Sequence, residues 1–312
     1  MTINSEVRYA SSPEDAKRYD TAELRRRYLI ENVFSADEVN MTYTMHDRMI
    51  AGGAMPVGEI LELKPIDILR ADYFLERREM GIFNVGGKGI VTAGDKEYEL
   101  DYKEALYLGR GSRKVTFRSL DPANPAKFYF CSANAHATYP DHKTTKENAV
   151  HMELGTLEES NHRVINRMLV KEVVPTCQLQ MGMTELKPGS TWNTMPAHTH
   201  NRRMEVYFYF GQTTNICLIL CLWWSVPASA IVVIVLPVPI SMRKAHPLLA
   251  TGITSFHLLH GKRHVQLPVL PVRHDEQVLR AVVRSVAVHV VDDFAFFKRS
   301  SDIRLSCSAS FL

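Results

Sequence analysis

The chain contains few cysteines: 5 in 312 residues, at Cys131, Cys177, Cys217, Cys221 and Cys307. Their odd number and sparse spacing do not indicate a disulfide framework. Cys217 and Cys221 have no second pair with which to form a typical zinc site. The first twenty residues contain no apolar run, so we expect no secretory signal. Together these absences predict a cytoplasmic protein.

The chain also has little excess charge, with a formal net charge of +3. A nucleic-acid-binding face would need Lys and Arg clustered on one element, and no such cluster occurs. The positive balance comes from the C-terminal third, because no Asp or Glu occurs between Gly211 and His274. We therefore expect no nucleic-acid partner, and we set residues 211–312 apart as an atypical tail.

A long stretch without charge includes Asn215 to Met242. Its length alone would allow a membrane span. Pro227, Pro237 and Pro239 interrupt it, and nothing upstream is typical of a membrane protein. We therefore expect no membrane span.

The rest of the chain divides into four segments. Residues 1–40 carry helix signals such as "SSPEDAK", and we expect a short helical segment there. Residues 41–140 alternate short β-branched and aromatic stretches with Gly, Asp and Pro, which predicts an antiparallel β-barrel. Residues 141–168 are polar and predict a linker with a short helix or turn. The β pattern resumes over 169–210, where we expect the start of a second barrel.

A weak internal repeat supports two copies of one β unit. "RREMGIFNVGG" (77–87) and "RRMEVYFYFG" (202–211) each contain an Arg pair, a Glu, an apolar strand and a glycine. The predicted fold class is therefore all-β, with two related barrels and short N-terminal helices.

The stretch "NTMPAHTHNRRMEVYFYF" predicts a metal site. His198 and His200 are two residues apart and would point to the same face of a strand, and Glu205 follows across the turn "NRR". Two imidazoles and one carboxylate suit Zn²⁺, Fe²⁺, Mn²⁺ or Ni²⁺. The alternative is that His198, His200 and Glu205 are solvated loop residues without a metal. Arg202 and Arg203 are adjacent; we interpret them as solvated turn residues, with contact to a substrate carboxylate as the alternative.

These stretches resemble a known family. "PGSTWNTMPAHTH" with "RRMEVYFYF" is similar to the metal motif of the cupins. "YFLERREMGIFNVGGKGIVTAGDKEYEL" and "PAKFYFCSANAHATYP" narrow the resemblance to the 5-keto-4-deoxyuronate isomerases. It covers roughly residues 6–210 and leaves 211–312 unmatched, and we interpret that tail as the product of a shifted reading frame or a mis-joined gene segment.

The resemblance implies a double-cupin fold and a cytoplasmic ketol-isomerase of pectin and uronate breakdown. The enzyme would interconvert 4-deoxy-L-threo-5-hexosulose uronate and 3-deoxy-D-glycero-2,5-hexodiulosonate, a small anionic sugar acid, and would assemble as a homo-oligomer, often a hexamer. It implies a Zn²⁺ ion in the second barrel, held by His198, His200 and Glu205. The first barrel, with Glu79 in the repeat but no His-x-His, would be metal-free and structural.

The match to the family is incomplete, and two alternatives to an active isomerase stay open. The family has a fourth histidine ligand in a Ser-Ile-His-Ser-Gly context, which this chain lacks; His246 has different surroundings, and we assign it no role. A chain with an incomplete second barrel would be inactive. A metal-dependent oxygenase is the other alternative, because two His and one carboxylate also form the iron facial triad.

Overall fold

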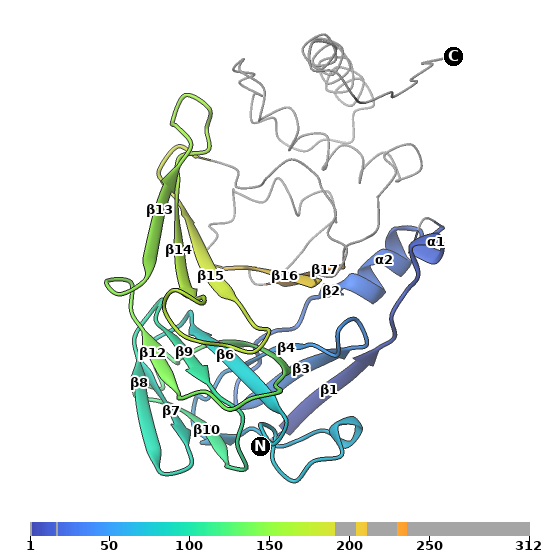
Figure 1. The fold of residues 1–312 in the computed structure, drawn as a ribbon, viewed down its shortest axis with the longest axis vertical. Helices are drawn as coiled ribbons and strands as arrows, with labels where there is room; N and C mark the ends of the chain where they lie inside the picture. The colour runs from blue at the N-terminus through green and yellow to red at the C-terminus, as the bar shows by residue number, and fades with distance from the viewer. Residues whose placement is uncertain (1, 17, 191–203, 211–229, 236–312) are drawn as a thin grey trace.

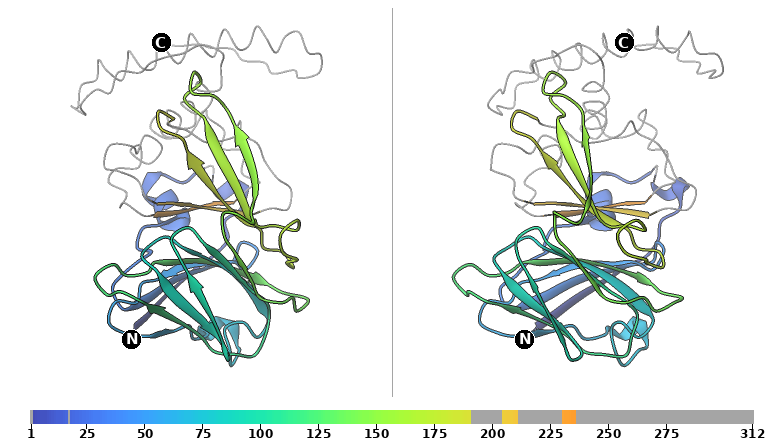
Figure 2. Two further views of the ribbon diagram at one scale, coloured as in Figure 1. Left: turned by 90° about the vertical axis from the view of Figure 1, so that its left-hand side faces the viewer. Right: turned by 60° about the vertical axis from the view of Figure 1, so that its left-hand side comes forward.

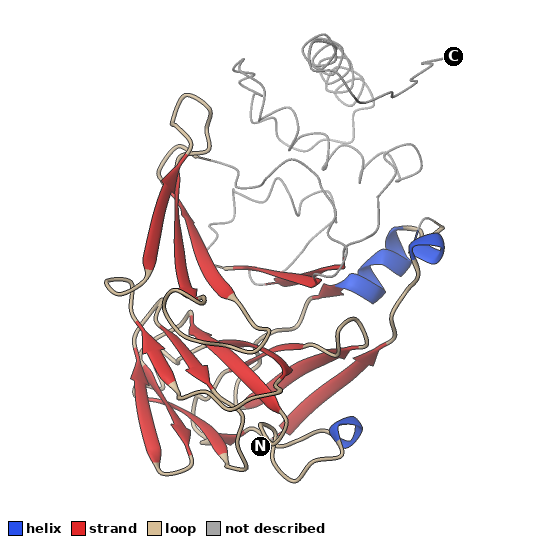
Figure 3. Ribbon diagram, viewed as in Figure 1, coloured by secondary structure: helices blue, strands red, loops and turns tan. Residues whose placement is uncertain are grey.

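The computed structural model describes residues 2–16, 18–190, 204–210 and 230–235 (Figure 1). Most regular structure in these residues is β-strand, as Figure 3 shows. The short helices are α1 (Pro13–Ala16), α2 (Thr21–Tyr28) and the 3₁₀ helix η1 (Asp67–Leu69). The prediction of an all-β fold with short N-terminal helices is therefore confirmed. No helix among the described residues is long and apolar enough to cross a membrane.

Two sheets face each other in the first unit, which we call the sandwich. The larger has the order β1-β3-β4-β11-β6-β9-β12 and the smaller β5-β10-β7-β8. The larger sheet comprises β1 (Thr2–Arg8), β3 (Glu38–Thr44), β4 (Ile50–Ala54), β11 (Phe128–Asn134), β6 (Arg78–Asn84), β9 (Ala105–Leu108) and β12 (His142–Thr144). The smaller comprises β5 (Leu61–Glu62), β10 (Val115–Ser119), β7 (Gly89–Ala93) and β8 (Lys96–Leu100).

The sandwich forms because apolar residues of strands in both sheets point into the space between the sheets. Its core contains fully buried side chains from both sheets, among them Ile50, Met80, Ile82, Leu100, Phe117, Phe128 and Phe130. The ring of Phe117 lies 5.3 Å from that of Phe128 and 6.4 Å from that of Phe130. Hydrophobic side chains therefore fill the interior of this unit.

The strands expected over 41–140 are present, but in the described residues they form two facing sheets and not the closed barrel that we expect, and the unit begins earlier. Residues 2–8, which we expect in the N-terminal helical segment, form β1, and β1 pairs parallel with β3. Asn4, Ser5 and Glu6 are exposed on this edge strand, so the sequence shows little of the alternation typical of a half-buried strand.

The second unit comprises two smaller sheets that lie against the sandwich (Figure 2). One has the order β13-β14-β15 and the other β16-β17-β2. Their strands are β13 (Val150–Leu154), β14 (Arg163–Leu169), β15 (Met181–Leu186), β16 (Met204–Tyr209), β17 (Ala230–Val235) and β2 (Leu29–Ile30).

Two expectations about this part of the chain are wrong. Residues 141–168, expected as a linker, contain β12, β13 and most of β14, because "VHMEL" and "RVINRML" pair in register across five residues. We also expect the tail to supply no partner for the strand that begins near Glu205. Instead, β17 pairs antiparallel with β16 along its whole length, since its Ile and Val residues favour extended backbone. The other residues of the tail lie outside those described.

A second apolar cluster joins the two units across the outer face of the larger sheet. It includes Phe83 and Tyr129 from the sandwich and Leu169, Leu179 and Met183 from the second unit. The ring of Phe208 stacks on that of Tyr129, with centroids 4.2 Å apart. Gly81 lies at the contact, since a Cβ there would come within 2.8 Å of Leu169.

An ion network also connects the units. The Nζ atoms of Lys103 and Lys146 lie 2.6 and 2.8 Å from the carboxylate of Glu185 on β15, and the Asn166 amide donates to it at 3.0 Å. Partial burial opposes ionisation of Glu185. The hydrogen bonds from Lys103 and Lys146 outweigh it and lower the pKa of Glu185 to about 2, from an ordinary value of 4.5.

We predict that Glu185→Gln lowers the free energy of unfolding by about 1–2 kcal/mol at pH 7. The folded pKa is depressed, so the contribution is complete above pH 4.5 and is lost as pH falls toward 2. Urea unfolding at pH 7 and at about pH 3 should therefore show a smaller gap between variant and wild type at the lower pH. Glu97→Gln, at an exposed position on β8, is the control. An equal gap at both pH values would contradict the network.

Candidate metal centre

Glu205 is the one predicted metal ligand that the described residues include. It lies on β16, where Met204, Val206 and Phe208 pack against the second apolar cluster. Because side chains alternate along a strand, Glu205 and Tyr207 lie on the opposite face. His198 and His200 lie outside the described residues, as do Arg202, Arg203 and His246. The convergence of the three ligands therefore stays a prediction.

Tyr207 supports the carboxylate of Glu205. Its hydroxyl donates a hydrogen bond to Oε2 of Glu205 at 2.9 Å. Carboxylates that bind metals usually accept such a bond from a neighbouring side chain, which fixes their orientation. From the sequence we interpret Tyr207, Phe208 and Phe210 as strand core and interface, and Tyr207 is 39% exposed. Its spacing of two from Glu205 is the signal that places both on one face.

The repeat places the two glutamates on opposite faces. With the Arg pairs aligned, Glu79 corresponds to Met204 and Met80 to Glu205. Met80 is fully buried in the sandwich core, whereas Glu79 points to the outer face of the larger sheet, like Met204. The first unit thus has a methionine where the second has its predicted metal ligand. Among the described residues, no three His, Cys, Asp or Glu side chains are grouped so as to hold a metal.

The carboxyl group of Glu79 binds the second unit instead. It is 0% exposed, and both of its oxygens accept hydrogen bonds. Oε1 accepts from the backbone N–H groups of Gln178 and Leu179, both at 2.7 Å. Oε2 accepts from the N–H of Cys177 at 2.7 Å and from the hydroxyl of Tyr107 at 2.8 Å. Glu79 therefore fixes the segment that leads into β15.

Tyr107 is held as a donor by its surroundings. Burial, reinforced by the hydrogen bond to Glu79, raises the pKa of Tyr107 well above its ordinary value. The hydroxyl thus stays protonated at neutral pH and keeps donating to Glu79. The sequence carries no local signal for this pair, because 28 positions separate Glu79 from Tyr107.

Arg78, the second arginine of the first repeat, is buried like Glu79. Arg78 is 4% exposed and donates to the Ser132 hydroxyl at 3.0 Å, to the Asn134 side chain at 3.0 Å and to the Ser132 carbonyl at 2.7 Å. Burial lowers the pKa of Arg78 to about 10. This arginine shares the inward face of β6 with Met80, since the two are two positions apart in the strand.

Comparison with known proteins identifies relatives over two-thirds of the chain. A model of the KduI/IolB family matches residues 28–216. The 4-deoxy-L-threo-5-hexosulose-uronate ketol-isomerase of Bacteroides fragilis is 69% identical over 210 residues, which cover 67% of this chain and 75% of that protein. The enzyme of the same name from Formosa agariphila is 57% identical over 209 residues, again 67% and 75% of the two chains. An IolB-like crystal structure from Salmonella typhimurium aligns with a TM-score of 0.38 and 15% identity, over 52% of this chain and 61% of that one.

We predict a graded loss of stability when the Glu79 contacts are removed. Glu79→Gln places an amide NH₂ against backbone N–H groups and should lower the free energy of unfolding by about 2–4 kcal/mol. Tyr107→Phe removes one donor and should lower it by about 1 kcal/mol. Urea unfolding measures both, with Tyr73→Phe at a partly exposed position as the control. Equal stability of Glu79→Gln and wild type would show that the segment 177–179 is held by other contacts.

Proposed function

Because the chain belongs to the KduI/IolB family, we propose that it is a uronate ketol-isomerase. The observation that carries this proposal is the 69% identity to a protein named as that isomerase. The reaction would interconvert 4-deoxy-L-threo-5-hexosulose uronate and 3-deoxy-D-glycero-2,5-hexodiulosonate. Within the family this would be a step of pectin and uronate breakdown in the cytoplasm, carried out by a homo-oligomer, a hexamer in our reading of the resemblance.

We propose that His198, His200 and Glu205 hold one Zn²⁺ ion per subunit. The donor set suits zinc, and the hydrogen bond from Tyr207 to Glu205 supports the fit of the carboxylate. When bound, the ion supplies positive charge near the carbonyl oxygen of the substrate. Tyr207 would hold the carboxylate of Glu205 in a fixed orientation. The side chains of the site would then need little rearrangement when the substrate binds.

The reaction moves a proton between two adjacent carbons, one of them next to a carbonyl. A side chain that takes the proton from one carbon and returns it to the other acts as general base and then as general acid. The substrate also carries a carboxylate, which a guanidinium binds through two parallel hydrogen bonds. A cation on the same face as Glu205 would therefore orient the sugar acid.

Of the two neighbouring arginines, we propose Arg203 for that contact. Its counterpart in the first repeat, Arg78, shares a face with Met80, the counterpart of Glu205. The counterpart of Arg202 is Arg77, whose side chain is 56% exposed. This favours Arg203 as substrate ligand and Arg202 as a solvated turn residue.

The second candidate is a chain of this family without activity. The match to the family model ends at residue 216, while the chain continues to Leu312. Catalysis would be lost if the remaining residues did not provide what the relatives provide in the quarter of their length that this chain does not match. An isomerase assay on the full chain separates this candidate from the first, and the coding DNA around codon 210 tests the reading frame.

We predict that purified protein contains zinc and isomerises the uronate, and that His200→Ala removes both. Loss of one of three protein ligands should reduce turnover by about 100-fold or more. Metal analysis and the isomerisation assay measure the two effects. His162→Ala changes a histidine that pairs with Glu153 on the second unit and should leave both unaffected. Retention of zinc and turnover in His200→Ala would contradict the assigned ligands, and oxygen uptake would point to an oxygenase.

A second prediction concerns the matched pair of arginines. Arg203→Lys should raise KM for the uronate by about tenfold, because an ammonium replaces a two-pronged contact. Arg202→Lys should leave KM within about twofold of wild type. Steady-state kinetics of both variants test this. The opposite order would show that the repeat does not predict the inward-facing arginine.

A further inference from the structure

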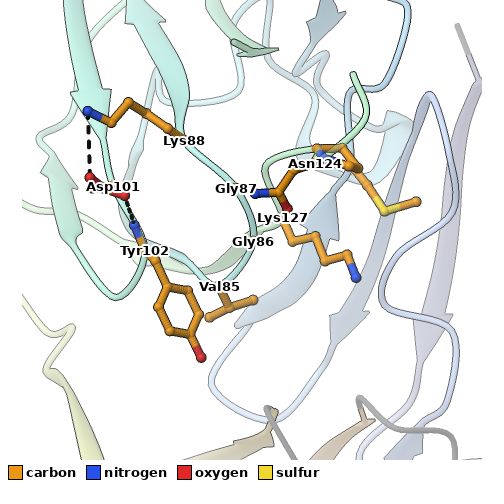
Figure 4. Close-up of a pocket in the computed structure, with 10 residues that line it drawn as sticks. Val85, Gly86, Gly87, Lys88, Asp101, Tyr102, Asn124 and Lys127 are labelled. Carbon is orange, nitrogen blue, oxygen red and sulfur yellow. Dashed lines mark hydrogen bonds and ion pairs between the residues drawn. The ribbon is translucent and has the colours of Figure 1, made fainter. Parts of the chain in front are cut away.

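A groove lies at one end of the sandwich, on loops that the proposed reaction does not use. Its volume is about 710 Å³, which is within the range of small-molecule sites. It is lined by Met55, by Val85–Lys88 after β6, by Asp101 and Tyr102 after β8, and by Asn124, Pro125 and Lys127 before β11. Figure 4 shows the side chains of Tyr102 and Lys127 on either side of Val85.

One buried side chain fixes the three loops that form this groove. The amide of Asn84, which is 0% exposed, donates to the carbonyls of Gly87 at 2.7 Å and Leu100 at 3.0 Å. Its oxygen accepts from the N–H of Gly86 at 3.1 Å and of Lys127 at 3.2 Å. The walls are therefore held in place before any ligand arrives, which reduces the entropy lost on binding.

The two glycines of the wall bring the loops into contact. A Cβ on Gly86 would lie 2.5 Å from the backbone nitrogen of Lys127, and one on Gly87 would lie 1.9 Å from the carbonyl oxygen of Asn124. Only glycine permits this approach of two backbones. The packing places the stem of Lys127 beside the turn, and its ammonium group lies on the side of Val85 opposite Tyr102 (Figure 4).

Of the two lysines that line the groove, one is paired with carboxylates, and the ammonium group of the other can bind an anionic ligand. Lys88 lies 3.0 Å from the carboxylate of Glu99 and 3.5 Å from that of Asp101, so its charge is compensated. Lys127 forms no ion pair with the residues that the structure describes. Val85, Met55 and Pro125 provide an apolar floor, and Tyr102 is 46% exposed beside it.

We propose that this groove binds a small sugar acid. The carboxylate would pair with Lys127, and the C–H face of the ring would lie on Val85 and Tyr102. The amide of Asn124 and the carboxylate of Asp101 are suited to donate to and accept from sugar hydroxyls. Such a site would bind compounds of the substrate's chemical class at a position separate from Glu205 and β16.

The test is calorimetric titration of the full chain, stripped of metal with a chelator, with D-glucuronate, D-glucose and inorganic phosphate. D-glucuronate should bind saturably, and D-glucose, which carries a CH₂OH group in place of the carboxylate, about tenfold more weakly. Lys127→Met keeps the apolar stem and should weaken D-glucuronate binding about tenfold, whereas Lys96→Met, at an exposed position on β8, should change it by less than about twofold.

Absence of saturable binding, or equal affinity in Lys127→Met and wild type, would overturn the proposal. Phosphate that binds as tightly as D-glucuronate would also overturn it, because the site would then recognise charge alone. The titration reads heat from metal-free protein and not turnover. Loss of D-glucuronate binding in this groove is therefore distinguishable from loss of isomerase activity, because the two are measured separately.

Discussion

The carboxyl group of Glu79 is the contact on which the arrangement of the two units depends. A polar group that is fully buried must have its hydrogen-bonding capacity satisfied, or folding loses the free energy of its hydration. Glu79 satisfies this with three backbone N–H groups of the second unit and one hydroxyl of its own sheet. The start of β15 is therefore fixed against β6. Apolar packing around Gly81 and Phe208 surrounds this contact but is less directional.

One repeated strand thus serves two purposes. In the first unit its inward face carries Met80, and hydrophobic side chains fill the space between the sheets. In the second, the corresponding position is Glu205, supported by Tyr207. The outward faces also differ, because Glu79 uses hydrogen bonds where Met204 uses apolar contact. A shift of one residue between the glutamates accounts for this division, since neighbouring residues of a strand face opposite sides.

The sequence is sufficient to predict the fold class and the strands with clear alternation, such as β7 and β8 around Gly94. It predicts less where pairing is decided by distant residues. The polar segment 141–168 pairs into sheets, and β1 is an exposed edge strand whose partner lies 36 residues further on. Glu79 cannot be assigned from its neighbours because its partners lie 28 to 100 positions away. Of the predicted metal ligands, Glu205 is placed on a strand, and the roles of His198 and His200 rest on the motif and the family.

Hydrogen exchange at the segment 177–179 tests the role of Glu79 most directly. If Glu79 holds this segment, the amides of Cys177, Gln178 and Leu179 should exchange about as slowly as the central strands of the larger sheet. In Glu79→Gln they should exchange much faster, while amides of β4 and β11 change less. Fast exchange of these three amides in the wild-type protein would contradict the account, because it would show that the segment opens without disturbing the sandwich.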